Sequence, residues 1–411
     1  MRFPRPAISH APEQPVINDS APLWLRSVSR PGAVVFALMF TLESLTRAVL
    51  LTIIPLQAYE ILGNARDVSL LYVGVGLTGV AGSFTIPLLI RRFRRRRVYV
   101  GGVCLLIVTA GLLATGTLVG QILAMLCRSI GAAALNITLS LYVMDYIRKR
   151  DLVRSEPLKL MFSATAWGIG PLLGVALQQH FGRGAPELVS ALSGVALLAY
   201  FAYLRLTENP AVAAATRPVA NPFANIRRFV AQPRLRLAWV IPFARSVFWS
   251  MFFIYPPVYF IQQGLGPLAG GVLGSVGNGL LIFTPLFGGL AQRIGLRRPI
   301  IAALAGSGTL CLMATIGFDH PWVVATCLTV GAIGAVALDG LANIPFMRAV
   351  HPYERPQMTT VFRTYIDFSD LLSAGLYAVL LGYFDLRAVF CATGLGLIAV
   401  AFVARLLPRR M

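Results

Sequence analysis

The segment Gly288–Arg298 reads GGLAQRIGLRR and follows a long apolar run. An earlier segment, Pro87–Arg97, reads PLLIRRFRRRR, lies 201 residues before it and also follows a long apolar run. Each combines an apolar end with a cluster of arginines, which is typical of a charged loop at the end of a membrane-spanning helix. The repeat of this loop predicts a chain built from two similar halves.

The composition is that of a multi-pass membrane protein. Hydrophobic residues make up 57% of the 411 residues and charged residues only 13%, whereas soluble domains hold about 25% charged residues. The mean hydropathy is +0.72. The net charge is +20, but the basic residues form short clusters between apolar runs, which argues against nucleic-acid binding. We therefore expect an all-α integral membrane protein whose surroundings are the lipid bilayer.

Twelve apolar segments are each long enough to span the bilayer core, which takes about 20 residues. A polar, Pro-rich N-tail (1–32) precedes them. The longest connection, 207–237, separates two predicted six-helix bundles, 33–206 and 238–407, and Phe223–Trp239 within and after it is predicted to be an interfacial amphipathic helix. The predicted spans are 33–55, 68–90, 98–117, 121–143, 158–181, 187–206, 238–262, 268–291, 299–318, 321–347, 359–383 and 386–407.

Lys and Arg orient these spans. Only Arg66, Arg183 and Arg387 fall in odd-numbered connections, while the tails and the even-numbered connections hold all the others outside the spans. Because positive loops stay on the cytoplasmic side, both termini are predicted to be cytoplasmic. We expect a monomer in a plasma membrane, namely a bacterial inner membrane.

The repeated loops resemble the motif of the major facilitator superfamily, G-x-x-x-D-R-x-G-R-R-K/R. The later copy has Gln292 in place of the Asp and Leu296 in place of the first Arg of the pair. The earlier copy departs further, with Pro87, Arg91 and Arg94 in place of Gly, Asp and the second Gly. Plain topogenic charge is the alternative explanation for both loops. The residues of the later copy assigned to gating are Gly288, Gln292, Arg293, Gly295, Arg297 and Arg298.

Two further segments are similar to motifs of the same family. Arg128-Ser-Ile-Gly131 on span four is similar to R-x-x-x-G-x-G-x-A, one residue tighter. Gly170-Pro171-Leu-Leu-Gly174 on span five looks like the G-P-x-x-G of antiporters. The alternative for span five is close helix packing through small residues. The resemblance implies the superfamily's fold, two six-helix bundles, and secondary transport by a chain that is not an enzyme.

Polar and charged residues inside the spans are the candidate substrate and proton pathway. A charge at the bilayer centre costs about 2.5–3.5 kcal/mol, so it is kept where partners, water or a ligand offset that cost. The candidates are Glu43, Arg47, Arg128, Arg245, Asp339, Asn343, Arg363, Asp367 and Asp370.

Spacing predicts which of these residues share a helical face. Glu43 and Arg47 are four apart, and they form either a self-neutralising pair or a titratable acid controlled by an arginine. Asp339 and Asn343 also share a face. Because spans one, four, seven and ten line the cavity of the family that the chain resembles, Arg245 is the expected partner of Asp339.

Span eleven carries a stripe of Arg363, Asp367 and Asp370 at i, i+4 and i+7. The surplus carboxylate of this stripe is a candidate for the coupling proton. The alternative places Arg363 in the headgroup region. Arg128 and Arg245 suit a bound anion, or they extend toward the cytoplasmic surface.

Span seven and the loop after span four are predicted to take part in gating. Pro256-Pro257, set among Trp249, Tyr255 and Tyr259, is expected to break its helix at the cavity. The three aromatic residues are candidates for contact with the substrate, and lipid or packing contact is the alternative. Asp145, Arg148 and Glu156 are expected to make gating salt bridges, against a role as solvated charges.

The sequence excludes several other activities. The scattered His and Cys residues predict no metal site, no cofactor is expected, and Lys149 and Lys159 lie outside any P-loop pattern. We expect a small-molecule substrate and protons as partners, moved by proton-coupled efflux or antiport. Uptake by proton symport is the alternative, and a non-transporting membrane sensor or assembly factor is the alternative from another class.

Overall fold

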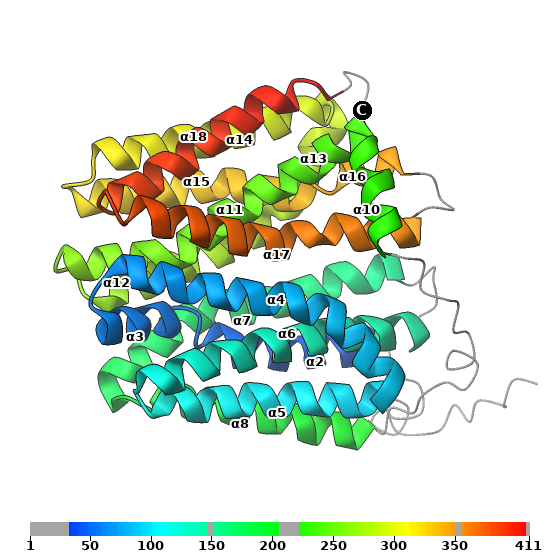
Figure 1. The fold of residues 1–411 in the computed structure, drawn as a ribbon, viewed down its shortest axis with the longest axis vertical. Helices are drawn as coiled ribbons and strands as arrows, with labels where there is room; N and C mark the ends of the chain where they lie inside the picture. Colours follow the sequence, from blue (N-terminus) through cyan, green and yellow to red (C-terminus); the bar gives the residue numbers. More distant parts are fainter. Residues whose placement is uncertain (1–32, 147–151, 205–221, 351–354, 408–411) are drawn as a thin grey trace, which may run out of the picture.

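A computed structural model describes residues 33–146, 152–204, 222–350 and 355–407 (Figure 1). These residues form helices joined by short turns, and no strand occurs among them. The helices of the first half are α2 (Ala33–Ala48), α3 (Ile53–Leu62), α4 (Ala65–Phe93), α5 (Arg95–Ala114), α6 (Leu118–Tyr146), α7 (Leu152–Phe181) and α8 (Ala185–Leu204). Those of the second half are α10 (Pro222–Ala231), α11 (Pro233–Gln262), α12 (Pro267–Gly279), the 3-10 turn η1 (Leu280–Phe283), α13 (Thr284–Ile294), α14 (Arg297–Ile316), α15 (Pro321–Leu341), α16 (Ile344–Ala349), α17 (Arg355–Leu380) and α18 (Arg387–Ala404).

Each predicted span coincides with helix in the described chain. Nine helical stretches in the described ranges are long and apolar enough to cross a membrane. The predicted spans 68–90, 158–181 and 359–383 coincide with α4, α7 and α17, which are 29, 30 and 26 residues long. These three helices are not among the nine, so the total of twelve spans stays a prediction.

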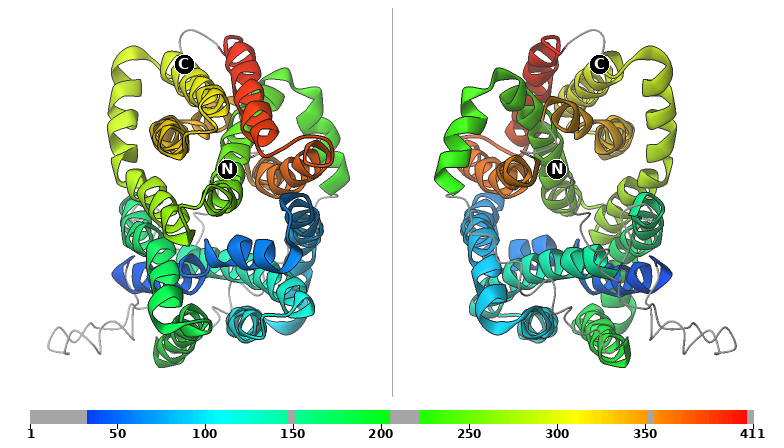
Figure 2. Two further views of the ribbon diagram at one scale, coloured as in Figure 1. Left: turned by 90° about the vertical axis from the view of Figure 1, so that its left-hand side faces the viewer. Right: turned by 90° about the vertical axis from the view of Figure 1, so that its right-hand side faces the viewer.

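The helices gather into two bundles, one above the other in Figure 1. Helices α2 to α8 form the N-terminal bundle, and α10 to α18 form the C-terminal bundle. Within them α2 packs on α7, α5 on α6 and α8, and α14 on α15 and α18. Viewed along the helices, the bundles meet along α4–α17 and α7–α12 (Figure 2).

The repeated loops form the same turn in both bundles. Helix α4 ends at Phe93 and Arg94 has a φ of 67°, while α13 ends at Ile294 and Gly295 has a φ of 84°. Leu296 is buried in the core of its bundle, which accounts for an apolar residue where the family motif has arginine. We call the end of the molecule that holds both turns the loop-motif end.

Hydrogen bonds join the two bundles in the half of the molecule away from the loop-motif end. The Ser69 and Tyr255 hydroxyls lie 2.8 Å apart in a buried contact. Gln262 Nε2 donates to Tyr59 Oη over 2.9 Å, at the opposite end of the helices. The backbone there also comes close, because a Cβ on Gly76 would lie 2.9 Å from Leu371 Cα. The structure is therefore the conformer in which the bundles are joined at the end opposite the loops.

Helix α11 runs unbroken through Pro256 and Pro257, so the predicted break at this pair is wrong. Each proline removes the N–H that would bond the carbonyl four residues earlier, and the helix nevertheless continues through both to Gln262. Gly270 of α12 makes room for them, since a Cβ there would lie 2.8 Å from Pro257 Cα. The aromatics Tyr255 and Tyr259 are fully buried, so they pack in the core in this conformer.

The breaks occur in other spans. Predicted span one is interrupted at 49–52, between α2 and α3, and continues to Leu62. Span eight is interrupted by η1, and span ten at Ala342–Asn343, between α15 and α16. Helix α10 overlaps the predicted interfacial segment and buries Phe229 against Phe346. Helix α11 begins at Pro233, inside the predicted central loop.

Candidate functional site

The predicted contact between Arg245 and Asp339 is confirmed. Arg245 Nη1 of α11 donates to Asp339 Oδ1 of α15 over 2.7 Å, and Trp249 Nε1 donates to Asp339 Oδ2 over 3.0 Å. Both carboxylate oxygens are therefore bound. The two charged side chains are 12% and 21% exposed, so solvent still reaches the pair.

The Arg245 guanidinium also contacts α17. Its Nη2 donates to Tyr365 Oη over 3.3 Å and to Ser246 Oγ over 3.2 Å, and the Tyr365 ring lies 5.6 Å from the guanidinium carbon. The Arg245 guanidinium of α11 thus forms hydrogen bonds with side chains of both α15 and α17. Half-buried Asn343 lies one turn after Asp339 at the α15–α16 junction.

The stripe on α17 lies on a continuous helix, which places Arg363, Asp367 and Asp370 at successive turns. Ser250 of α11 donates its hydroxyl to Asp370 Oδ1, and the Asp370 side chain is exposed. Asp367 approaches the other bundle, because a Cβ on Gly79 of α4 would lie 3.7 Å from Asp367 Oδ1. Arg363 is exposed.

Glu43 and Arg47 of α2 form the predicted pair, with Arg47 Nη1 and Glu43 Oε1 3.1 Å apart. The Glu43 side chain is 3% exposed and that of Arg47 is 22% exposed. The ring of Trp167 of α7 lies 5.5 Å from the guanidinium carbon. Each bundle therefore holds an Arg–carboxylate pair with a tryptophan against it.

Arg128 binds the carboxyl end of α2. Its Nη1 donates to the backbone oxygen of Arg47 over 3.0 Å, and Ser190 Oγ donates to Thr46 O over 2.7 Å. Carbonyls in the last turn of a helix have no partner within it, and a cation is favourable at this end of the helix dipole. Arg128 lies near the middle of α6 and is half-buried.

The Gly-Pro segment of α7 is a packing joint between two helices. A Cβ on Gly170 would lie 2.5 Å from Ala48 Cβ, and one on Gly174 would lie 1.9 Å from Val49 O, at the break after α2. On its other side Pro171 contacts α12, because a Cβ on Gly274 would lie 3.3 Å from Pro171 Cβ. In this conformer the contacts of all three residues are those of close helix packing, the alternative considered for this motif, and a role in antiport stays a prediction.

The remaining predicted gating residues lie at the loop-motif end. Gly288 lies in α13, Gln292, Arg293 and Arg298 are exposed and Arg297 is half-buried. Asp145 lies in the last turn of α6 and Glu156 in the first turns of α7, while Arg148 lies outside the described residues. Their predicted gating role stays a prediction.

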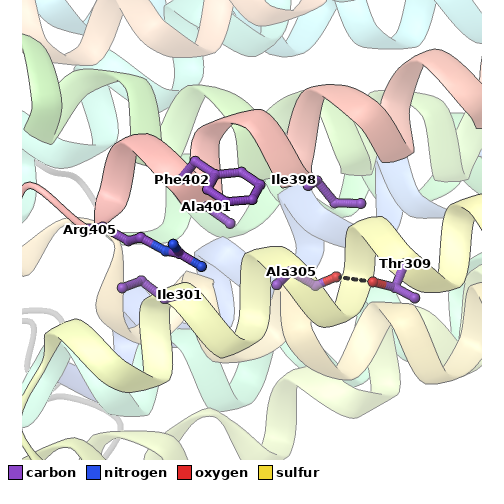
Figure 3. A pocket seen from close by; sticks show the side chains of 7 residues that line it. All are labelled: Ile301, Ala305, Thr309, Ile398, Ala401, Phe402 and Arg405. Carbon is purple, nitrogen blue, oxygen red and sulfur yellow. Dashed lines mark hydrogen bonds between the residues drawn. The ribbon is translucent and has the colours of Figure 1, made fainter.

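A groove between α14 and α18 lies on the outer side of the C-terminal bundle, away from these charges (Figures 1 and 3). Its lining is mostly apolar, with Arg405 over Phe402 at one end. Across the described ranges, no group of three or more His, Cys, Asp or Glu is arranged to hold a metal ion.

Sequence reasoning missed Trp167, Tyr365 and Ser250, which contact the predicted charges. Ser250 has no signal in the sequence, because its partner lies 120 residues away. Trp249 was singled out as an aromatic, but its bond to Asp339 was not expected. Trp249 lies four residues after Arg245, so both side chains are on one helical face. This spacing is a sequence signal from which a shared partner could be predicted.

Comparison with solved structures shows the same fold. The chain matches a POT family transporter in complex with 5-aminolevulinic acid, with a TM-score of 0.73 and 13% identity over 91% of this chain and 95% of that one. It matches the nucleoside transporter NupG with the same TM-score and identity over 91% and 98%. A POT family transporter in complex with a thioalcohol conjugated peptide gives a TM-score of 0.70 and 13% identity over 90% and 95%.

A comparison with curated proteins finds no match. The model of the Major Facilitator Superfamily matches residues 36–369, which is most of the chain and extends through both bundles. This match agrees with the resemblance of the two loops and with the two-bundle fold. The chain is therefore a multi-pass membrane transporter that belongs to the major facilitator superfamily.

Proposed function

We propose that this protein moves a small polar or charged solute across the membrane by alternating access, coupled to protons. The observation that carries the proposal is the set of charges within the spans of both bundles. Asp339 and Asp370 belong to the C-terminal bundle and Arg47 and Arg128 to the N-terminal bundle, and each is bound by specific side-chain or backbone groups.

The conformation supports this proposal. The bundles are joined away from the loop-motif end through Ser69–Tyr255 and Gln262–Tyr59, yet Asp370, midway along α17, is exposed. A transporter open toward its loop-motif end is expected to combine these features. By the distribution of Lys and Arg, that end is the cytoplasmic side of a bacterial inner membrane, with both termini there.

Asp339 is the proposed coupling acid. Its Oδ1 accepts a hydrogen bond from the Arg245 guanidinium, and its Oδ2 accepts one from the Trp249 indole N–H. Protonation would remove the ion pair and release the Arg245 guanidinium, which also contacts Tyr365 of α17. A proton on one carboxylate would thereby change the contacts between α11, α15 and α17.

The chemistry of the structural neighbours supports a polar solute. They include a transporter in complex with 5-aminolevulinic acid and a nucleoside transporter. Antiport is our first expectation for direction, from the Gly170-Pro171-x-x-Gly174 segment. Symport is the alternative, which the sign of proton movement would reveal.

The test is proton flux in proteoliposomes that carry an interior pH dye, challenged with amino acids, peptides, sugars, nucleosides, organic anions and antimicrobials. We expect substrate-dependent proton movement that is lost in Asp339→Asn and kept in Asp385→Asn. Asp385 is an exposed acid at the opposite end of the molecule, so its variant controls for loss of a carboxylate. Correctly inserted protein that moves no proton for any compound would contradict proton coupling.

A further inference from the structure

Two opposite charges, one from each bundle, lie outside the ion pairs of the site. Glu43 pairs with Arg47 and Asp339 pairs with Arg245. Arg128 instead contacts a backbone carbonyl, and Asp370 contacts the hydroxyl of Ser250. Neither of these contacts is with a group of opposite charge.

These two charges lie on either side of one helix. Arg128 is on α6 and Asp370 on α17, and both helices pack against α4. At Gly79 of α4 a Cβ would meet Ser129 Oγ at 3.4 Å and Asp367 Oδ1 at 3.7 Å. Ser129 follows Arg128 directly and Asp367 lies one turn before Asp370, so α4 brings the two regions together.

Tyr72 also lies on α4, two turns before Gly79. Arg128 and Tyr72 are half-buried, whereas the Asp370 side chain is exposed. The N-terminal bundle thus presents a guanidinium, and the C-terminal bundle presents a carboxylate, at the same region of α4.

We propose that the solute is a zwitterion, with its anionic group bound by Arg128 and its ammonium group bound by Asp370. A guanidinium suits a carboxylate or phosphonate through two parallel hydrogen bonds. A solute with one charge would meet one favourable and one repulsive group, which selects against it. This inference rests on the transport function proposed above and names its substrate class.

A zwitterion would also link recognition to closure. Its two ends contact different bundles, so its binding is strongest where the bundles are close at the site. A ligand shifts a conformational equilibrium only by its difference in affinity between the two states. A solute with both charges supplies that difference, whereas one with a single charge binds one bundle alone.

The test is binding to the purified full chain, measured by thermal shift and calorimetry with matched probes. The zwitterions are single amino acids, 5-aminolevulinic acid and dialanine. The single-charge relatives are levulinic acid, N-acetyl-dialanine and dialanine amide. We expect at least one zwitterion to bind about 10- to 100-fold more tightly than its relatives, the usual range for a charge-assisted bond.

Variants then assign the two charges. Asp370→Asn should remove the preference for the zwitterion over the N-acetyl compound, and the affinity for that anion should not fall, because the variant removes a carboxylate that repels it. Arg128→Gln should remove the preference over the amide. Because Arg128 also binds the end of α2, Asp370→Asn is the decisive variant, and Asp385→Asn is the matched control that should keep the full preference.

Three outcomes would overturn the proposal: equal binding of a single-charge relative, stabilisation by no zwitterion in the panel, or an unchanged preference in Asp370→Asn. Proton flux separates this from the transport function. Flux driven by a solute with one charge would support proton-coupled transport and refute the zwitterion. Tight zwitterion binding without proton flux would support the zwitterion and refute proton-coupled transport.

Discussion

Arg94 holds a backbone conformation that side chains rarely adopt, with φ 67° and ψ 147°. Gly295 has nearly the same conformation in the other loop, φ 84° and ψ 160°. Such a conformation costs a non-glycine residue about 1–3 kcal/mol of stability. A glycine avoids this strain but loses about 0.5–1 kcal/mol, because it gives up more backbone freedom on folding. Arg94→Gly should therefore stabilise the protein by about 1 kcal/mol. Thermal unfolding in detergent measures this change in stability. The control is Arg96→Gly, which removes the same charge from within α5 and should destabilise the protein.

The Arg245–Asp339 pair allows a second test at the scale of residues. Asp339→Asn leaves the Arg245 guanidinium without its counter-ion at a mostly buried position, which should cost about 3 kcal/mol. Adding Arg245→Gln should recover much of this, so that a double-mutant cycle gives a coupling of about 1–3 kcal/mol. Glu60→Gln, at the exposed Arg183–Glu60 pair, should change stability by less than about 1 kcal/mol. Additive effects of the two substitutions would refute the coupling.

At the scale of elements, α7 can pack on the break after α2 only because Gly174 has no side chain. A Cβ there would lie 1.9 Å from Val49 O, so Gly174→Ala must push the helices apart. We expect a loss of about 2–3 kcal/mol, read as a lower melting temperature and more aggregated protein on size exclusion. Gly168→Ala, two turns earlier in α7, would place its Cβ 3.7 Å from Gly279 Cα and should be neutral or stabilising. Equal effects of the two variants would contradict this account.

The sequence could predict helices better than their interruptions. Long apolar runs with charged ends identify spans because bilayer thickness sets their length, and the i, i+4 spacing identified Glu43–Arg47. Val49–Thr52 contains no Gly or Pro, and the break there coincides with contacts from Gly174 and Arg128, which come from other helices far along the chain. Pro256-Pro257 suggested a break that the packing of α11 on Gly270 of α12 prevents. Contacts between distant helices, such as Ser250 with Asp370, leave no pattern in one sequence.

For the whole molecule, alternating access requires the contacts opposite the loop-motif end to separate. Tyr59 and Gln262 bridge the bundles there, with 2.9 Å between Oη and Nε2. In a chain whose five native cysteines are replaced, Tyr59→Cys with Gln262→Cys can be joined by a cleavable bis-maleimide. We expect cross-linking to reduce substrate-driven proton flux to background, and cleavage of the linker to restore it, because the bundles must part at this end. The matched control is Glu60→Cys with Arg183→Cys, an exposed pair within the N-terminal bundle, whose cross-link should leave flux unchanged. Full flux with Tyr59→Cys and Gln262→Cys joined would mean that transport proceeds without separation of the bundles at this end, contrary to alternating access.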